Sequence, residues 1–252
     1  MQQPPPPIVF YSINSKKILM KKIFLALLAM ISLHAGYSQN SDNNRETRSV
    51  PAFHGVGVSG GIDLYITSGP ASVSVSAANS NIRNHMVTEV INGILQIHLE
   101  KNWRPDESNP KMKVYVSATG LDQLGASGGG DIYIEKELTA GTLHVNLSGG
   151  GNMEGKLTAE HLNINQSGGS NVKLTGNVKD LNVESSGGGN LEGYQLITDY
   201  TSIHSSGGSN AEITVNKELR VVASGGSDVY YKGTATVKEI KSSGGGSVTH
   251  KD

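Results

Sequence analysis

A Ser-Gly-Gly triplet that recurs along most of the chain is the feature that most limits its fold. The triplets begin at Ser59, Ser127, Ser148, Ser167, Ser186, Ser206, Ser224 and Ser243. From Ser127 onward, successive triplets are 18 to 21 residues apart. A period of this length is typical of repeat architectures, in which a unit buries its apolar side only by stacking on its neighbours.

The residues around each triplet indicate strand, glycine turn and strand. The positions three before and five after each serine are apolar in all eight repeats, and polar residues alternate with apolar ones, as in 143–147 (LHVNL). Alternation with period two indicates a half-buried strand. The position four after the serine holds a short polar residue that favours turns. Seven of these eight residues are Asp63, Asp131, Asn152, Asn171, Asn190, Asn210 and Asp228.

The sequence therefore predicts an all-β fold, a right-handed parallel β-helix (β-solenoid) of about seven coils. The repeats span 121–252, and we expect a first coil and an irregular β-rich cap over 50–120, with a hairpin at Asn92-Gly93. We expect the Asn/Asp column to form a hydrogen-bonded ladder from coil to coil. Leu, Ile and Val should fill the interior and leave no cavity for a small molecule.

The N-terminus has the pattern of a secretory signal peptide. Two lysines follow Met20, an apolar run of eleven residues follows them, and small residues precede Gln39. The sequence predicts a signal peptide over 20–38 with cleavage after Ser38, and export to the periplasm, the outer-membrane surface or the medium. The apolar run is too short to span a bilayer of about 30 Å, and we expect no transmembrane segment after it. We interpret 1–19 as a mis-assigned translation start and 39–49 as a flexible leader.

Composition and motifs argue against several classes of function. Removing 1–38 takes four of the 21 basic residues and none of the 22 acidic ones, which leaves a net charge near −5 and discourages nucleic-acid binding. The absence of Cys excludes disulfides and thiolate zinc sites. The glycine turns lack the Lys of a phosphate-binding loop, and most lack the Asp of a calcium-binding roll. We expect no catalytic residue, no metal and no cofactor.

Three stretches resemble one known family. They are 53–64 (FHGVGVSGGIDL), 92–97 (NGILQI) and the column of Ser-Gly-Gly-x-Asn/Asp turns. Together they are similar to the head GIN domain of "putative auto-transporter adhesins", which is frequent in exported proteins of Bacteroidetes. The resemblance covers about residues 50–250. It implies a β-helical fold, a surface or periplasmic location and an adhesin-like role.

Three functions follow as hypotheses. The first is an exported adhesin-like protein that presents an extended solenoid surface to a glycan or to an envelope or surface protein. The alternative is a structural or envelope-stress component with no ligand of its own, and the third is a polysaccharide-processing enzyme. Trp103 and Arg104, in the polar loop 101–110, are the candidate binding residues, since they can stack on a sugar or anchor a partner. Trp103 can equally cover the core as a lid.

Overall fold

The computed structural model describes residue 3 and residues 44–252. The predicted signal peptide, 20–38, and the interpretation of 1–19 as a mis-assigned start lie outside the described residues, apart from residue 3. Within the described part the secondary structure is strand except for one short helix, α2 (Ser80–Asn84), whose Ile82 is buried.

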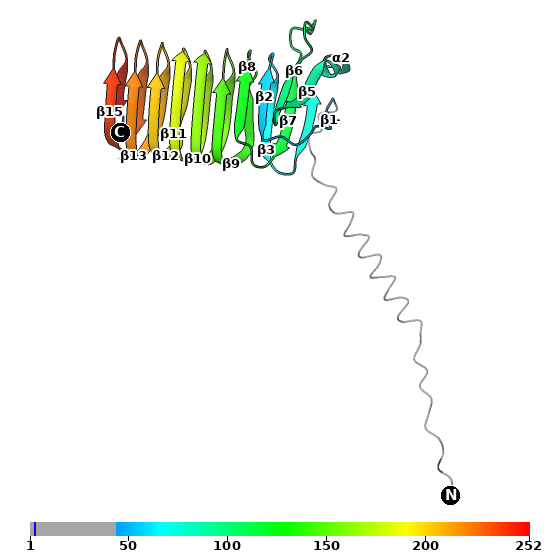
Figure 1. Ribbon diagram of the computed structural model, residues 1–252, viewed down its shortest axis with the longest axis horizontal. Coiled ribbons are helices and arrows are strands. Elements are labelled where there is room, and N and C mark those ends of the chain that lie inside the picture. The colour runs from blue at the N-terminus through cyan, green and yellow to red at the C-terminus, as the bar shows by residue number, and fades with distance from the viewer. Residues whose placement is uncertain (1–2, 4–43) are drawn as a thin grey trace. The chain divides into compact units, whose positions relative to one another are not determined.

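The strands fall into a cap group and a repeat group (Figure 1). The cap group and first coil comprise β1 (Glu46–Arg48), β2 (Gly55–Ser59), β3 (Asp63–Ser68), β4 (Ser72–Ser76), β5 (Met86–Ile91), β6 (Ile94–Leu99) and β7 (Lys113–Ala118). The repeat group comprises β8 (Gln123–Ser127), β9 (Ile132–Leu147), β10 (Asn152–Gly168), β11 (Asn171–Gly187), β12 (Asn190–Ser205), β13 (Asn210–Ala223), β14 (Asp228–Lys232), β15 (Thr236–Ser242) and β16 (Ser247–His250).

The repeat strands stack in parallel, and equivalent residues of neighbouring coils lie side by side apart from local register shifts, such as the one between Lys173 and Gly176. Asn171 of β11 lies opposite Asn152 of β10 on one side and Asn190 of β12 on the other. Each long strand bends around the coil, so every coil contributes to two walls (Figure 1). We call the segments that precede the glycine turns wall A and those that follow them wall B. The predicted all-β solenoid of about seven turns is confirmed.

Glycine is required where the turns of neighbouring coils touch. Gly168 has φ +75°, and a Cβ there would lie 2.6 Å from the carbonyl oxygen of Gly149. The turn backbones are also hydrogen-bonded to one another, since the N–H of Gly169 donates to the Gly149 oxygen at 2.8 Å. A side chain at this corner would therefore clash with the same corner of the neighbouring coil.

The core is aliphatic along most of each coil and polar beside the glycine turns. Val183 and its column neighbours Ile164 and Ile203 have no exposed surface. The interior positions nearest the turns are instead buried polar side chains: Gln166, Ser170, Ser185, Ser205, Ser209 and Ser227. The expectation of an interior filled by Leu, Ile and Val is thus wrong at this corner in several coils, although Leu147 keeps the inward position before its turn apolar.

The cap inverts the order of the first coils. β2 pairs with both β6 and β8, and β3 pairs with both β7 and β9, all in parallel. The coil formed by β6 and β7 therefore lies outside the coil formed by β2 and β3, although it comes later in the sequence. Antiparallel strands finish both walls, with β5 on β6 across the predicted Asn92-Gly93 turn and β4 on β7.

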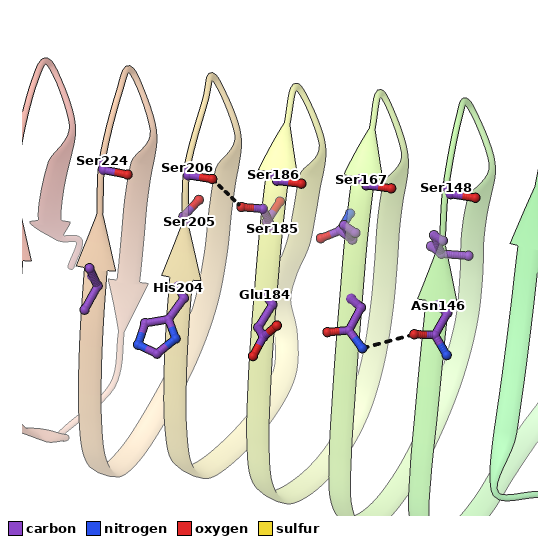
Figure 2. Close-up of a pocket in the computed structure, with 14 residues that line it drawn as sticks. Asn146, Ser148, Ser167, Glu184, Ser185, Ser186, His204, Ser205, Ser206 and Ser224 are labelled. Atoms are coloured by element: carbon purple, nitrogen blue, oxygen red, sulfur yellow. Dashed lines mark hydrogen bonds between the residues drawn. The ribbon is translucent and has the colours of Figure 1, made fainter.

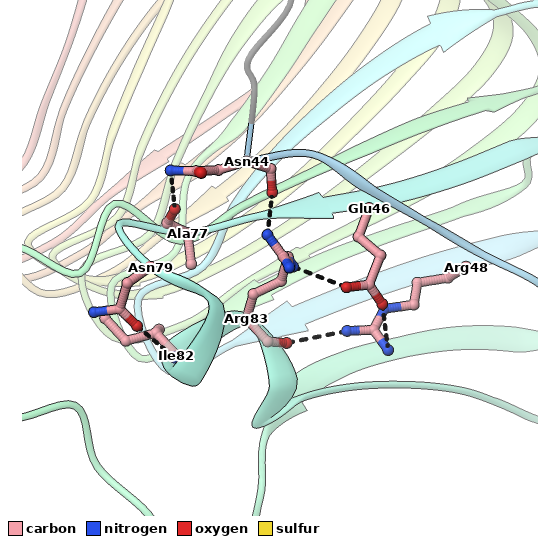
Figure 3. Close-up of polar contacts among 7 residues, drawn as sticks. All are labelled: Asn44, Glu46, Arg48, Ala77, Asn79, Ile82 and Arg83. Carbon is pink, nitrogen blue, oxygen red and sulfur yellow. Dashed lines mark hydrogen bonds and ion pairs between the residues drawn. The ribbon is translucent and has the colours of Figure 1, made fainter.

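The end of the predicted flexible leader is an ordered strand. β1 pairs antiparallel with β4, and Arg83 at the end of α2 holds it in place (Figure 3). The Arg83 Nε lies 2.9 Å from Glu46, Arg83 Nη1 donates to the Asn44 oxygen at 2.8 Å, and Arg48 donates back to the Arg83 oxygen at 3.0 Å. The prediction of flexibility over 39–49 is therefore wrong from residue 44 onward, because these side chains pair with the cap and cover the edge of β4.

Candidate functional site

The outer surface of wall A carries four columns of mostly polar side chains along β9 to β13. We call this surface the polar face. In-register pairing places equivalent residues of successive coils side by side, as for Asn163 and Asn182. The columns are Thr142, His161, Asp180, Tyr200 and Glu218; His144, Asn163, Asn182, Ser202 and Arg220; Asn146, Asn165, Glu184, His204 and Val222; and Ser148, Ser167, Ser186, Ser206 and Ser224.

Two neighbouring hollows occupy the polar face. The larger, of about 840 Å³, follows the two columns nearest the glycine turns, where Figure 2 shows Asn146, Glu184 and His204 below a row of serines. The smaller, of about 410 Å³, follows the other two columns, including Asn163 and Asn182. Together they make a shallow trough that crosses several coils.

The predicted Asn/Asp column lies on the other wall, where most of its side chains bond to one another. Asn152 donates to Asp131 at 2.8 Å, Asn171 to Asn152 at 2.9 Å and Asn190 to Asn171 at 2.9 Å. Asn210 continues the series at 3.1 Å from Asn190. In each central residue the amide nitrogen and the amide oxygen are thus both used, which leaves little capacity for a ligand.

The two ends of this column differ from its centre. Asp228 accepts a hydrogen bond from Ser247 at 2.5 Å. Asp63 lies next to Asp131 at the cap end, and the Leu64 N–H donates to the Asp131 carbonyl at 2.7 Å. Burial, with a contribution from the charge of Asp131, raises the pKa of Asp63. The hydrogen-bonded ladder therefore runs from Asp131 to Asn210.

Two of the four side-chain amides of the polar face are free, in contrast to the ladder. Asn163 and Asn182 are half-buried neighbours, and neither side chain makes a hydrogen bond to any residue that the structure describes. In the adjoining column, Asn165 donates to Asn146 at 3.0 Å. Half-buried amides with unused donors and acceptors are suited to binding a polar ligand.

Carboxylates outnumber fixed positive charges on the polar face, with Asp180, Glu184 and Glu218 against Arg220. His161 lies 2.9 Å from Asp180, and Arg220 lies 3.6 Å from Glu218. Glu184 has His204 as its neighbour on the next coil. The four columns contain no Lys. The face therefore has no basic patch that would attract an anionic polymer.

The predicted binding residues Trp103 and Arg104 lie in the loop between β6 and β7. This loop takes the place of the glycine turn in the outermost coil and, with Gly60 and Gly61, lines a hollow of about 650 Å³. The Trp103 ring stacks on His85, with ring centres 4.2 Å apart and planes 8° apart, and packs against the core. Arg104 is exposed beside it. One face of the indole is therefore covered, as a lid requires.

An aromatic column on wall B escaped the sequence analysis. The rings of Tyr115, Tyr65 and Tyr133 stack at 5.1 and 5.0 Å, and the Arg45 guanidinium covers the outer Tyr115 ring at 3.4 Å. Burial and the neighbouring Asp131 raise the pKa of Tyr133 to about 12. Tyr65 and Tyr133 both lie six residues after a triplet serine, and this shared offset could have identified the pair. The rings cover one another's faces and leave mainly edges exposed.

The described residues contain no cluster of three or more His, Asp or Glu side chains that could hold a metal ion. In the same part of the chain, no helix is both long enough and apolar enough to cross a membrane.

A model of the family described as "Putative auto-transporter adhesin, head GIN domain" matches residues 52–235, most of the chain. The chain belongs to this family. No curated protein matches it. The matched residues include the whole of the polar face and nearly all of the cap.

Known structures of similar fold carry adhesin and lipid-binding names. A putative adhesin from Bacteroides fragilis has a TM-score of 0.75 at 22% identity, over 82% of this chain and 96% of that one. A putative adhesin from Parabacteroides merdae has a TM-score of 0.63 at 15% identity, over 82% and 95%. A putative lipid binding protein from Parabacteroides distasonis has 0.62 at 17% identity, over 84% and 98%. At these identities the likeness shows the shared fold.

Proposed function

We propose that this head GIN domain is an exported adhesin-like protein whose polar face binds a glycan or a protein of a cell surface or envelope. The observation that carries the proposal is the pair Asn163 and Asn182, which are half-buried, in register and free of hydrogen bonds to the described residues. The asparagines of wall B that also lie in register, such as Asn171, have their amide nitrogen and oxygen bonded to one another in the ladder. The family's adhesin name supports a surface-binding role.

Export is part of this proposal. The basic residues after Met20, the apolar run and the small residues before Gln39 support a cleaved signal peptide. Mass spectrometry of the protein from the envelope or the medium should find Gln39 at or near its N-terminus. An intact peptide that spans Ser38 and Gln39, recovered from the exported protein, would contradict cleavage at this site.

The proposed role is non-enzymatic. The family's adhesin name supports binding over catalysis. Two of the three acidic groups of the polar face also differ from the paired carboxylates of a glycosidase, because Asp180 lies 2.9 Å from His161 and Glu218 lies 3.6 Å from Arg220. Cleavage of a polysaccharide that is lost on changing one of these carboxylates would contradict a purely binding role.

The hollow beside Trp103 and Arg104 is a second candidate binding surface. Its support is the exposed Arg104 next to a half-buried indole. The Trp103 ring has one face on His85, so a sugar or side chain could use only the other. The Arg104→Ala variant tests this surface without removing the indole from the core.

The test is to measure binding of the exported protein to glycans and to envelope proteins, and to compare two variants. Asn163→Ala/Asn182→Ala should lose binding, while Arg104→Ala should retain it. Loss of binding in Arg104→Ala alone would move the site to the cap hollow. No binding to any glycan or envelope protein would refute the proposal and favour a structural role without a ligand.

A further inference from the structure

We infer that the ligand of the polar face is an uncharged glycan chain that runs along the solenoid axis, across the coils. This inference rests on the proposed function and assigns that site its ligand class and direction. It follows from three properties of the face: the repeat of its free groups, its charge and its scarcity of large apolar side chains.

The free groups of the face repeat from coil to coil along a straight line. Asn163 pairs in register with Asn182, and Asn182 with Ser202. Neighbouring strands of a sheet lie about 4.8 Å apart. The rings of an extended glycan succeed one another at a similar spacing, so successive sugars can meet equivalent side chains. A ligand that lies across the coils would use this match, whereas one that follows a single strand would not.

The chemistry of these groups fits sugar hydroxyls. An amide offers two donors and one acceptor oxygen, and a serine hydroxyl can act in either role. A sugar hydroxyl also both donates and accepts, so a row of amides and hydroxyls can bind it in several rotations. The row of serines at the rim of the larger hollow, from Ser148 to Ser224, adds hydroxyls along the same direction (Figure 2).

The charges of the face favour an uncharged ligand. Arg220 lies 3.6 Å from Glu218, and His161 lies 2.9 Å from Asp180, a contact that is an ion pair only when the imidazole is protonated. Glu184 projects into the larger hollow without an ion-pair partner among the described residues (Figure 2). A carboxylate there repels uronic acids and sulfated sugars, and the columns hold no Lys to offset it. A neutral glycan faces no such repulsion.

A protein partner would suit the face less well. Interface cores are enriched in aromatic and large apolar anchors that enter well-packed pockets. The polar face has one aromatic residue, Tyr200, which is 38% exposed and has the Lys217 ammonium over its ring at 5.4 Å. The hollows are shallow troughs across several coils, and most of the residues that line them are polar.

The test measures affinity of the full exported protein for neutral and acidic glycans of increasing length. Neutral β-linked and α-linked glucan and mannan oligosaccharides serve as neutral probes, with polygalacturonate and heparin oligosaccharides as acidic ones. We expect binding of a neutral series, with affinity rising as the chain lengthens from two to about five sugars. Asn182→Ala should weaken this binding about tenfold, the effect of losing one or two hydrogen bonds.

Asn177→Ala is the matched control, because Asn177 is an exposed asparagine of the same strand on wall B. It should leave the affinity unchanged. Preference for the acidic series, affinity independent of chain length, or equal loss in both variants would overturn the inference. If only an envelope protein binds, and Asn182→Ala abolishes it, the glycan inference fails while the proposed function stands. If neither glycan nor protein binds, both fail.

Discussion

The Asn171 side-chain amide donates a hydrogen bond of 2.9 Å to the side-chain oxygen of Asn152, on the neighbouring coil. Asn171 also accepts one from Asn190 at 2.9 Å, so it joins three coils. Asn171→Ala should lower the free energy of unfolding by about 1–3 kcal/mol, because it leaves two half-buried groups without partners. Urea unfolding measures this difference.

Asn182→Ala is the control for stability, since its amide has no partner among the described residues. It should change the free energy of unfolding by less than about 0.5 kcal/mol. The two variants should also differ in the binding assay, where Asn171→Ala keeps the affinity and Asn182→Ala weakens it about tenfold. Equal loss of stability in both would refute the distinction between the ladder and the polar face.

Gly176 should tolerate no side chain. Its φ is +115°, and a Cβ would lie 2.1 Å from the Leu157 carbonyl oxygen. Gly176→Ala should destabilise the protein by about 2–6 kcal/mol through backbone strain and overpacking. Gly141→Ala, where a Cβ meets nothing within 4 Å, should change stability by less than about 1 kcal/mol. Similar melting temperatures for the two variants would contradict the close contact between coils at Gly176.

Two serines of the polar interior should respond in opposite directions to the same change. The buried Ser185 hydroxyl has no hydrogen-bond partner in the described part of the chain, whereas Ser209 bonds to Ser205 at 2.6 Å and to the Ser206 oxygen at 3.1 Å. Ser185→Ala should leave stability unchanged or raise it by about 1 kcal/mol, and Ser209→Ala should lower it by about 1–2 kcal/mol. Thermal melts compare them, and a large loss in Ser185→Ala would mean that its hydroxyl has a partner.

The pair His54 and Asp122 should make part of the cap's stability depend on pH. The His54 Nδ1 lies 2.7 Å from Asp122, and this hydrogen bond, followed by the Asp122 charge, raises the pKa of His54 above its usual 6.5. A raised histidine pKa gives stability that is fully present below about pH 6.5 and is lost as the pH rises through the folded-state pKa. An NMR titration should find the raised value, and Asp122→Asn should return it toward 6.5. A wild-type His54 that titrates at or below 6.5 would contradict the pair.

The periodic part of the fold was predictable because each coil has to bury the same apolar column and to fit its turn against the turns of its neighbours. The column that includes Val183 had to be inward, and the glycines had to lie where coils touch, as Gly168 does. The cap was less predictable. β2 and β3 carry the same pattern as any coil, and nothing local shows that β6 and β7 stack outside them. That placement depends on contacts between distant segments.

The candidate site was predictable in location more than in residues. The sequence indicated a binding flank, but all outward asparagines look alike in a pattern of period two. What separates Asn171 from Asn182 is the hydrogen bonding of their side chains. Asn171 bonds to Asn152 and Asn190, whereas Asn182 bonds to no residue in the described part of the chain. Trp103 was similarly ambiguous, and His85, 18 positions earlier in the sequence, covers one face of its ring.

The in-register stacking of the ladder asparagines has a consequence for how such proteins can vary. Asn152, Asn171 and Asn190 follow one another at 19-residue intervals and bond in the same direction. If residues 171–189 were duplicated, the asparagine of the added coil would lie between Asn171 and Asn190 and could bond to both. The cap and the last coil would not change. The duplication would also add one further row to the trough. The length of the solenoid and the number of rows in the trough can thus change by one coil at a time, while the side chains of the existing rows stay the same.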